Sequence, residues 1–257
     1  MRLAVSSWSL RDHVNRDFPL QDFPRVIKER YGVEAVELCQ MHFRAQDSKY
    51  LDEIINGLKA AGSVVINMPI DTGNISQLDE RKRNHDIKII EGWMDVAAYV
   101  GSPNIRVNTG SQNQGVVDLS ITVDSYRKLA EYGEKIGVMV LLENHGGISA
   151  DPHNIVRLFE EVGHKNFGAC PDFGNFSPEV RYQGLEMMAK YAVIAHAKTY
   201  DFDEETKMSE EDFVKCLNIL KSAGFDGYLS VEFEGKKDQY SGVKRAIELI
   251  KVSCKTD

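Results

Sequence analysis

Cysteine is scarce in this sequence, and the few cysteines are far apart. The 257 residues include four of them, none in a CxxC pair: Cys39, Cys170, Cys216 and Cys254. A disulfide framework or a zinc knot needs cysteines at short, regular spacings. The pattern argues against both and indicates core thiols in a reducing compartment.

Long apolar runs are also missing. No window holds enough uninterrupted apolar residues to cross a bilayer. The first residues, MRLAVSSWSLRDH, become charged and polar too soon for a secretory signal peptide. We therefore expect a cytoplasmic protein without a membrane partner.

The sequence has no excess of positive charge. It carries 31 lysines and arginines against 39 aspartates and glutamates, which gives a formal net charge of -8. Surfaces that bind nucleic acids are usually basic. This balance argues against a nucleic-acid partner and leaves a small molecule as the expected one.

Short apolar runs alternate with segments of helical periodicity along the whole chain. The expected strands span residues 3–8, 35–38, 64–68, 104–108, 138–142, 167–171, 193–198 and 228–233. The expected helices span residues 21–31, 51–61, 79–100, 120–136, 152–162, 179–191, 209–224 and 241–252. Strict alternation implies parallel strands, and no glycine-rich fingerprint of a doubly wound sheet follows the first strand. The sequence therefore predicts one α/β domain over residues 1–257, a single (β/α)8 TIM barrel.

Four expected strands in the C-terminal half end on a polar residue. These residues are Glu143, Asp172, His196 and Glu232. In a TIM barrel the carboxyl ends of the strands form the active site, and a buried carboxylate there needs a compensating charge or donor. Three carboxylates and one imidazole suit manganese, magnesium or cobalt and can also hold zinc. We expect a divalent metal site, with Glu234 as the alternative to Glu232.

Two of these residues are also catalytic candidates. A metal ion chelated by the carbonyl and hydroxyl oxygens of a sugar acidifies the C–H bond between them and stabilises the resulting enediolate. Glu143 and Glu232, at the ends of different strands, are the expected pair that removes and returns the proton.

Further polar or aromatic residues lie near the same strand ends and are candidates for substrate binding. They are Trp8, Glu37, Arg106, Asn108, His145, Asn175 and Lys198. Each also has a structural alternative. Trp8 can belong to the core, Lys198 can form a salt bridge, and His145 can shape its loop or donate to a metal-bound carboxylate.

The strand-end motifs together resemble the xylose isomerase-like TIM barrels. The motifs are ENHGG, PDFGN, HAK and VEFEG, in this order. That superfamily holds sugar isomerases, ketose 3-epimerases, hydroxypyruvate isomerase, inosose and dehydroshikimate dehydratases, and endonuclease IV. The resemblance implies that Glu143, Asp172, His196 and Glu232 bind the metal and that the two glutamates act as acid and base.

The chain departs from the family pattern at two positions. Ketose 3-epimerases usually have a histidine where this chain has Asn175, and tend to have a glutamate where it has Thr199. The substrate contacts are therefore expected to differ from theirs. Endonuclease IV needs a histidine-rich trinuclear zinc site, which seven scattered histidines do not provide.

The sequence thus predicts a metal-dependent isomerase or epimerase that acts on a small sugar or sugar phosphate through an enediolate. One alternative is a dehydratase on a keto-sugar or keto-cyclitol, with His145 as the acid that expels a hydroxyl group. Another is a non-catalytic sugar-binding barrel. Phosphorylation of the substrate and the oligomeric state, a homo-oligomer included, stay open, and residues 201–207 form either a lid or a solvated loop.

Overall fold

Eight strands alternate with eight helices in the computed structural model, which describes residues 1–113, 115–202 and 208–254. The strands are β1 (Arg2–Ser6), β2 (Ala35–Glu37), β3 (Val64–Ile70), β4 (Asn104–Val107), β5 (Met139–Glu143), β6 (Phe167–Cys170), β7 (Ile194–Thr199) and β8 (Tyr228–Phe233). The α-helices are α1 (Phe23–Tyr31), α2 (Ser48–Ala61), α3 (Glu80–Val100), α4 (Leu119–Ile136), α5 (Pro152–Val162), α6 (Arg181–Ala189), α7 (Glu210–Ser222) and α8 (Gln239–Cys254). The predicted (β/α)8 barrel is confirmed.

The strands form one parallel sheet in the order β6-β5-β4-β3-β2-β1-β8-β7. Between β6 and β7 the sheet is joined by two isolated parallel bridges, Ala169 with Ala192 and Asp172 with His196. The barrel is therefore nearly closed. Its last bridge directly pairs two of the strand-end residues that the sequence marks as metal ligands.

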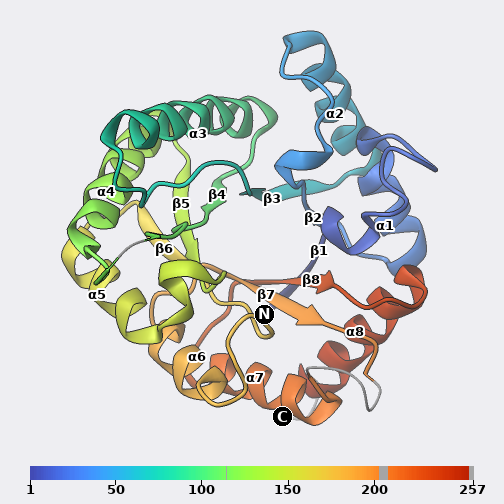
Figure 1. Cartoon of the computed structure of the whole chain (residues 1–257). Helices are drawn as coiled ribbons and strands as arrows, with labels where there is room; N and C mark the ends of the chain where they lie inside the picture. The colour runs from blue at the N-terminus through green and yellow to red at the C-terminus, as the bar shows by residue number, and fades with distance from the viewer. Residues whose placement is uncertain (114, 203–207, 255–257) are drawn as a thin grey trace.

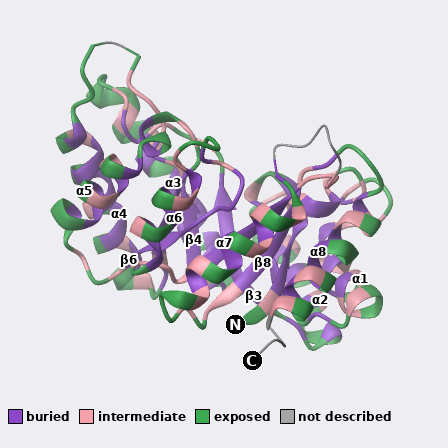
Figure 2. Cartoon of the chain, turned by 90° about the horizontal axis from the view of Figure 1, so that it is seen from below, coloured by how far each residue is buried: buried purple, intermediate pink, exposed green. Residues whose placement is uncertain are grey.

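The helices surround the strands as a ring, which Figure 1 shows along the barrel axis. Figure 2 shows the strands and the inward faces of the helices as buried and the outward faces as exposed. Helices α1, α2, α4 and α5 are strongly amphipathic, so their apolar stripes pack against the barrel wall. Four of them begin at an aspartate that accepts backbone N–H groups: Asp47, Asp79, Asp118 and Asp151.

The boundaries of three strands differ from the prediction in ways that affect the site. β1 ends at Ser6, because the Ser6 hydroxyl accepts the backbone N–H of Trp8 and starts a 3-10 turn, Ser7–Leu10. β3 continues through Pro69 to Ile70. Proline is tolerated there because β2 already ends opposite Asn67, so no partner needs the missing N–H. β4 ends at Val107, one residue before Asn108.

Part of the predicted polar loop after β7, residues 203–207, lies outside the described residues. Among the residues that are described, no helix combines the length and the apolar character needed to cross a bilayer.

Two glycines inside helices provide a test of the packing. A Cβ atom on Gly133 of α4 would lie 2.2 Å from the carbonyl oxygen of Val138, whereas one on Gly92 of α3 would meet nothing within 4 Å. We expect Gly133→Ala to lower the free energy of unfolding by about 1–3 kcal/mol through overpacking. Gly92→Ala should raise it by about 0.5–1 kcal/mol, because alanine loses less backbone entropy. Urea unfolding of both variants measures this, and equal shifts would contradict the packing.

Candidate active site

Four buried side chains from neighbouring strands converge at the carboxyl end of the barrel. Glu143 is the last residue of β5, Asp172 follows β6, His196 lies on β7 and Glu232 on β8. One ligand atom of each lies within 4.8 Å of the ligand atoms of the other three. Nδ1 of His196 is 2.8 Å from Oε1 of Glu143, 3.4 Å from Oε2 of Glu232 and 3.8 Å from Oδ2 of Asp172. The structure thus brings together the four residues that the sequence marked as metal ligands.

The donor set of this cluster fits a divalent ion. Oδ1 of Asp172 accepts the backbone N–H groups of Gly174 and Asn175 at 2.8 Å each, which turns Oδ2 toward the other ligands. Oδ2 of Asp172 and Oε2 of Glu232 are buried, and no described residue donates a hydrogen bond to them. Buried oxygens of this kind are costly unless a cation or a donor satisfies them. Three carboxylates with one imidazole are suitable ligands for magnesium, manganese or zinc.

The electrostatics of the cluster favour a positive charge at its centre. Burial alone would lower the pKa of His196, but the negative groups around the ring, Glu37 and Glu143 among them, outweigh burial and raise that pKa well above its ordinary value. Burial, with Glu143 and Glu232 nearby, raises the pKa of Asp172 well above its ordinary value although Lys198 opposes the change. The site therefore attracts a cation.

Arg106 is held between two carboxylates. Its Nε lies 2.8 Å from Oε2 of Glu143, and its NH1 atom donates to Asp71 and to Oδ1 of Asn108. Nδ2 of Asn108 also donates to Asp71 at 3.0 Å. Burial alone would raise the pKa of Glu143, but the charges of Arg106 and His196 hold it well below its usual range. Arg106 keeps Glu143 ionised.

Lys198 neutralises the opposite side of the cluster. Its Nζ is 3.5 Å from Oδ2 of Asp172 and 3.4 Å from Oε2 of Glu232, and it donates to Oδ1 of Asn175 at 2.9 Å. Asn175 in turn donates to Oε1 of Glu143 at 3.2 Å, so it bridges Lys198 and Glu143. Burial alone would raise the pKa of Glu232, but Lys198 and His196 lower it.

The remaining sequence candidates lie around this cluster. Trp8, on the 3-10 turn after β1, donates its Nε1–H to Glu234 at 2.8 Å, and Glu234 also faces Lys198 at 3.3 Å. Glu234 therefore lies outside the group of four ligands. His145 is exposed just beyond β5. Burial alone would raise the pKa of Asp71, but the charge of Arg106 lowers it. Glu37 is buried against Nε2 of His196.

Sequence reasoning missed two polar residues that organise the site. Asp71 orients Arg106 and Asn108, as described above. The side chain of Asn144 holds both backbone groups of Asp172, accepting its N–H at 2.7 Å and donating to its carbonyl oxygen at 2.9 Å. Both residues directly follow a strand, which is the signal that would have identified them.

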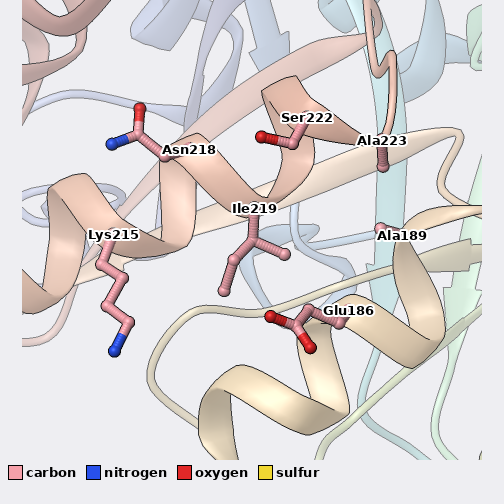
Figure 3. A pocket seen from close by; sticks show the side chains of 7 residues that line it. All are labelled: Glu186, Ala189, Lys215, Asn218, Ile219, Ser222 and Ala223. Carbon is pink, nitrogen blue, oxygen red and sulfur yellow. The ribbon is translucent and has the colours of Figure 1, made fainter.

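An open groove of about 400 Å³ lies elsewhere, between α6 and α7 (Figure 3). It is lined by Glu186, Ala189, Lys215, Asn218, Ile219, Ser222 and Ala223. Its lining includes the C-terminal ends of both helices, which in this fold lie on the side of the barrel opposite the carboxyl ends of the strands. The groove is therefore separate from the cluster.

The fold and the cluster define a TIM barrel in which three carboxylates and one histidine at the strand ends could hold a metal ion. The family model of the xylose isomerase-like TIM barrel matches residues 27–252. This chain therefore belongs to the xylose isomerase-like TIM barrel family.

Three solved structures illustrate the fold. A 3-keto-D-glucoside 4-epimerase from E. coli is 19% identical with a TM-score of 0.73, and the match covers 99% of each chain. A probable 3-DHS dehydratase from Bacillus anthracis is 17% identical with a TM-score of 0.76, covering 98% of this chain and 99% of that one. A family protein from Mycobacterium smegmatis, in complex with magnesium, is 16% identical with a TM-score of 0.72, covering 98% and 97%. At these identities the likeness shows the fold alone.

Metal removal tests the cluster. We expect chelator-treated protein to gain about 5–10 °C in Tm when a suitable divalent ion is added at about 100 times its Kd. Asp172→Asn should lose this rise, because one of the convergent anionic oxygens becomes an amide nitrogen. Asp124→Asn, on the exposed face of α4, is the control and should keep it. Thermal melts with manganese, magnesium, cobalt and zinc measure the effect, and an undiminished rise in Asp172→Asn would contradict the ligand set.

A buried histidine near the site makes stability depend on pH. Nδ1 of His42 is 2.9 Å from the Ser7 hydroxyl oxygen, and burial lowers the pKa of His42 to about 4. Between its ordinary value of 6.5 and about 4, His42 takes up a proton in the unfolded chain but not in the folded one. The stability from neutral His42 is therefore fully present above pH 6.5 and is lost as the pH falls.

We expect His42→Asn to reduce the loss of stability between pH 7.5 and pH 5. The wild-type free energy of unfolding should fall by ~2 kcal/mol more than that of the variant. Urea unfolding at both pH values, with the chelated proteins, gives the difference. Equal losses in the two proteins would show that His42 does not carry this dependence.

Proposed function

We propose that the protein is a divalent-metal-dependent isomerase or epimerase of a small sugar. The observation that carries this proposal is the convergence of three buried carboxylates and one imidazole nitrogen within 4.8 Å. Glu143, Asp172, His196 and Glu232 would hold the ion. A bound divalent ion supplies a Lewis acid that acidifies the C–H bond next to a sugar carbonyl.

Glu143 and Glu232 are the proposed proton carriers. Neighbouring cations lower the pKa of each carboxyl, so each is available as an anion to accept a proton from carbon. A proton returned by the same group to the adjacent carbon produces an isomer. A proton delivered from the other group to the opposite face of the original carbon produces an epimer. The ammonium group of Lys198, which faces Asp172 and Glu232, would also offset negative charge that develops on the substrate.

The charges around the cluster favour a neutral sugar over a phosphorylated one. Arg106 is occupied by Asp71 and Glu143, and Lys198 faces Asp172, Glu232 and Glu234. Among the described residues, the two basic side chains that contact the cluster are therefore already paired, and a phosphate would approach a set of carboxylates. A neutral polyol instead finds carboxylate and amide oxygens that accept from its hydroxyl groups.

Solvent-hydrogen exchange tests the reaction. We expect a neutral ketose, incubated in deuterated water with protein and metal, to take up deuterium on carbon and keep its molecular formula apart from that label. The phosphorylated form of the same ketose should react at least tenfold more slowly. NMR and mass spectrometry of a panel of ketoses and ketose phosphates measure both outcomes.

Matched variants identify the proton carriers. Glu143→Gln and Glu232→Gln should each lower the exchange rate by about 10²–10⁴-fold, because each removes a general base or acid. Glu131→Gln, on the exposed surface of α4, should leave it unchanged. Sugar binding without exchange, unaltered in Glu143→Gln, would instead indicate a non-catalytic barrel.

A dehydratase is the second candidate, because His145 is exposed two residues after Glu143, the last residue of β5. An imidazolium there can protonate a departing hydroxyl after a carboxylate has removed the neighbouring proton. Loss of water from a keto-sugar or keto-cyclitol, suppressed in His145→Ala, would favour this reaction over isomerisation.

A further inference from the structure

A fourth carboxylate lies on the far side of His196 from the three proposed ligands. Glu37, the last residue of β2, is fully buried. Its Oε2 lies 3.0 Å from Nε2 of His196, whereas the carboxylates of the three other proposed ligands face Nδ1. Glu37 therefore contacts the ring but not the metal position.

The geometry around the imidazole determines which nitrogen can bind a cation. A neutral imidazole carries one proton, and its other nitrogen offers the lone pair. An ionised carboxylate can only accept a hydrogen bond, so Glu37 favours the proton on Nε2. The lone pair is then left on Nδ1, which faces Glu143 at 2.8 Å.

The barrel holds Glu37 in this position through its neighbour on β3. The register between β2 and β3 shifts between Val36 and Glu37, so that Glu37 pairs with Asn67 instead of Ile66. Nδ2 of Asn67 donates to the same Oε2 of Glu37 at 3.0 Å. Bulges of this kind re-aim side chains next to functional sites.

We infer that Glu37 is a positioning residue that sets the tautomer and orientation of His196 for metal binding, with Asn67 as its support. The sequence suggested substrate contact for Glu37, and the hydrogen bond to Nε2 favours this other role. The inference rests on the proposed metal site. Partners of this kind usually change metal affinity by 10- to 100-fold.

The first test uses the unmutated, metal-loaded protein. With 15N-labelled histidine and zinc, long-range 1H–15N NMR distinguishes a protonated ring nitrogen from a metal-bound one. We expect one histidine with a proton on Nε2 and metal on Nδ1, assigned to His196 by its loss in His196→Gln. A proton on Nδ1 of His196 in the loaded protein would overturn the inference.

The second test is the metal affinity of variants. We expect Glu37→Gln to weaken manganese and cobalt binding by about 10- to 100-fold in titration calorimetry and to change the visible spectrum of bound cobalt. Asn67→Ser should weaken metal binding severalfold. This variant replaces Glu37→Gln in the test if Glu37→Gln does not fold. Glu34→Gln, three residues earlier, just before β2, and paired with Lys28 at the surface, is the matched control and should bind as wild type does.

The outcomes separate this inference from the proposed function. If Asp172→Asn abolishes binding while Glu37→Gln and Asn67→Ser both bind within twofold of wild type, the role of Glu37 is refuted and the metal site stands. If the wild-type protein binds none of the four metals, the proposed function and the inference both fail.

Discussion

The structure depends on the compensation of several carboxylates that are buried at one end of the barrel. Glu37, Glu143, Asp172 and Glu232 come from four different strand ends and are almost without solvent contact. Ionised carboxylates in such surroundings are strongly destabilising unless charged or hydrogen-bonding partners offset the free energy lost on desolvation. Arg106, paired with Glu143, and Lys198, paired with Asp172 and Glu232, provide part of that compensation. Oδ2 of Asp172 and Oε2 of Glu232 face Lys198 but accept no hydrogen bond from a described residue, and they mark where a divalent ion would fit.

The barrel wall makes this arrangement rigid. Asp172 and His196 face one another through the bridge that joins β6 to β7, and Asn144 fixes both backbone groups of Asp172. Ligands held by strands and by backbone hydrogen bonds keep their geometry better than ligands on free loops. The same elements that close the barrel therefore position Asp172 and His196.

A neutral amide lies among the charged groups of the cluster. Asn175 links Lys198 to Glu143. An amide donates and accepts hydrogen bonds without carrying a charge. The negative charge of Glu143 is therefore balanced by Arg106 and His196. This arrangement is consistent with a neutral substrate whose hydroxyl groups find acceptors at the rim, where Trp8 fixes Glu234.

The sequence by itself determined the barrel, because eight apolar runs alternate with eight amphipathic segments and only a parallel, closed arrangement buries them all. It also determined which polar residues stand at the strand ends, since a polar residue that interrupts a buried run is visible in the pattern. Only the tertiary structure decided what these residues contact. Whether Glu37 meets a substrate or His196 depends on a register shift against β3. Trp8 lies outside β1 because the Ser6 hydroxyl caps the turn that follows the strand. Arg106 is paired because Asp71, 35 residues away in the sequence, accepts a hydrogen bond from it. Periodicity specifies the face on which a side chain lies, but hydrogen bonds between distant strands specify its partner.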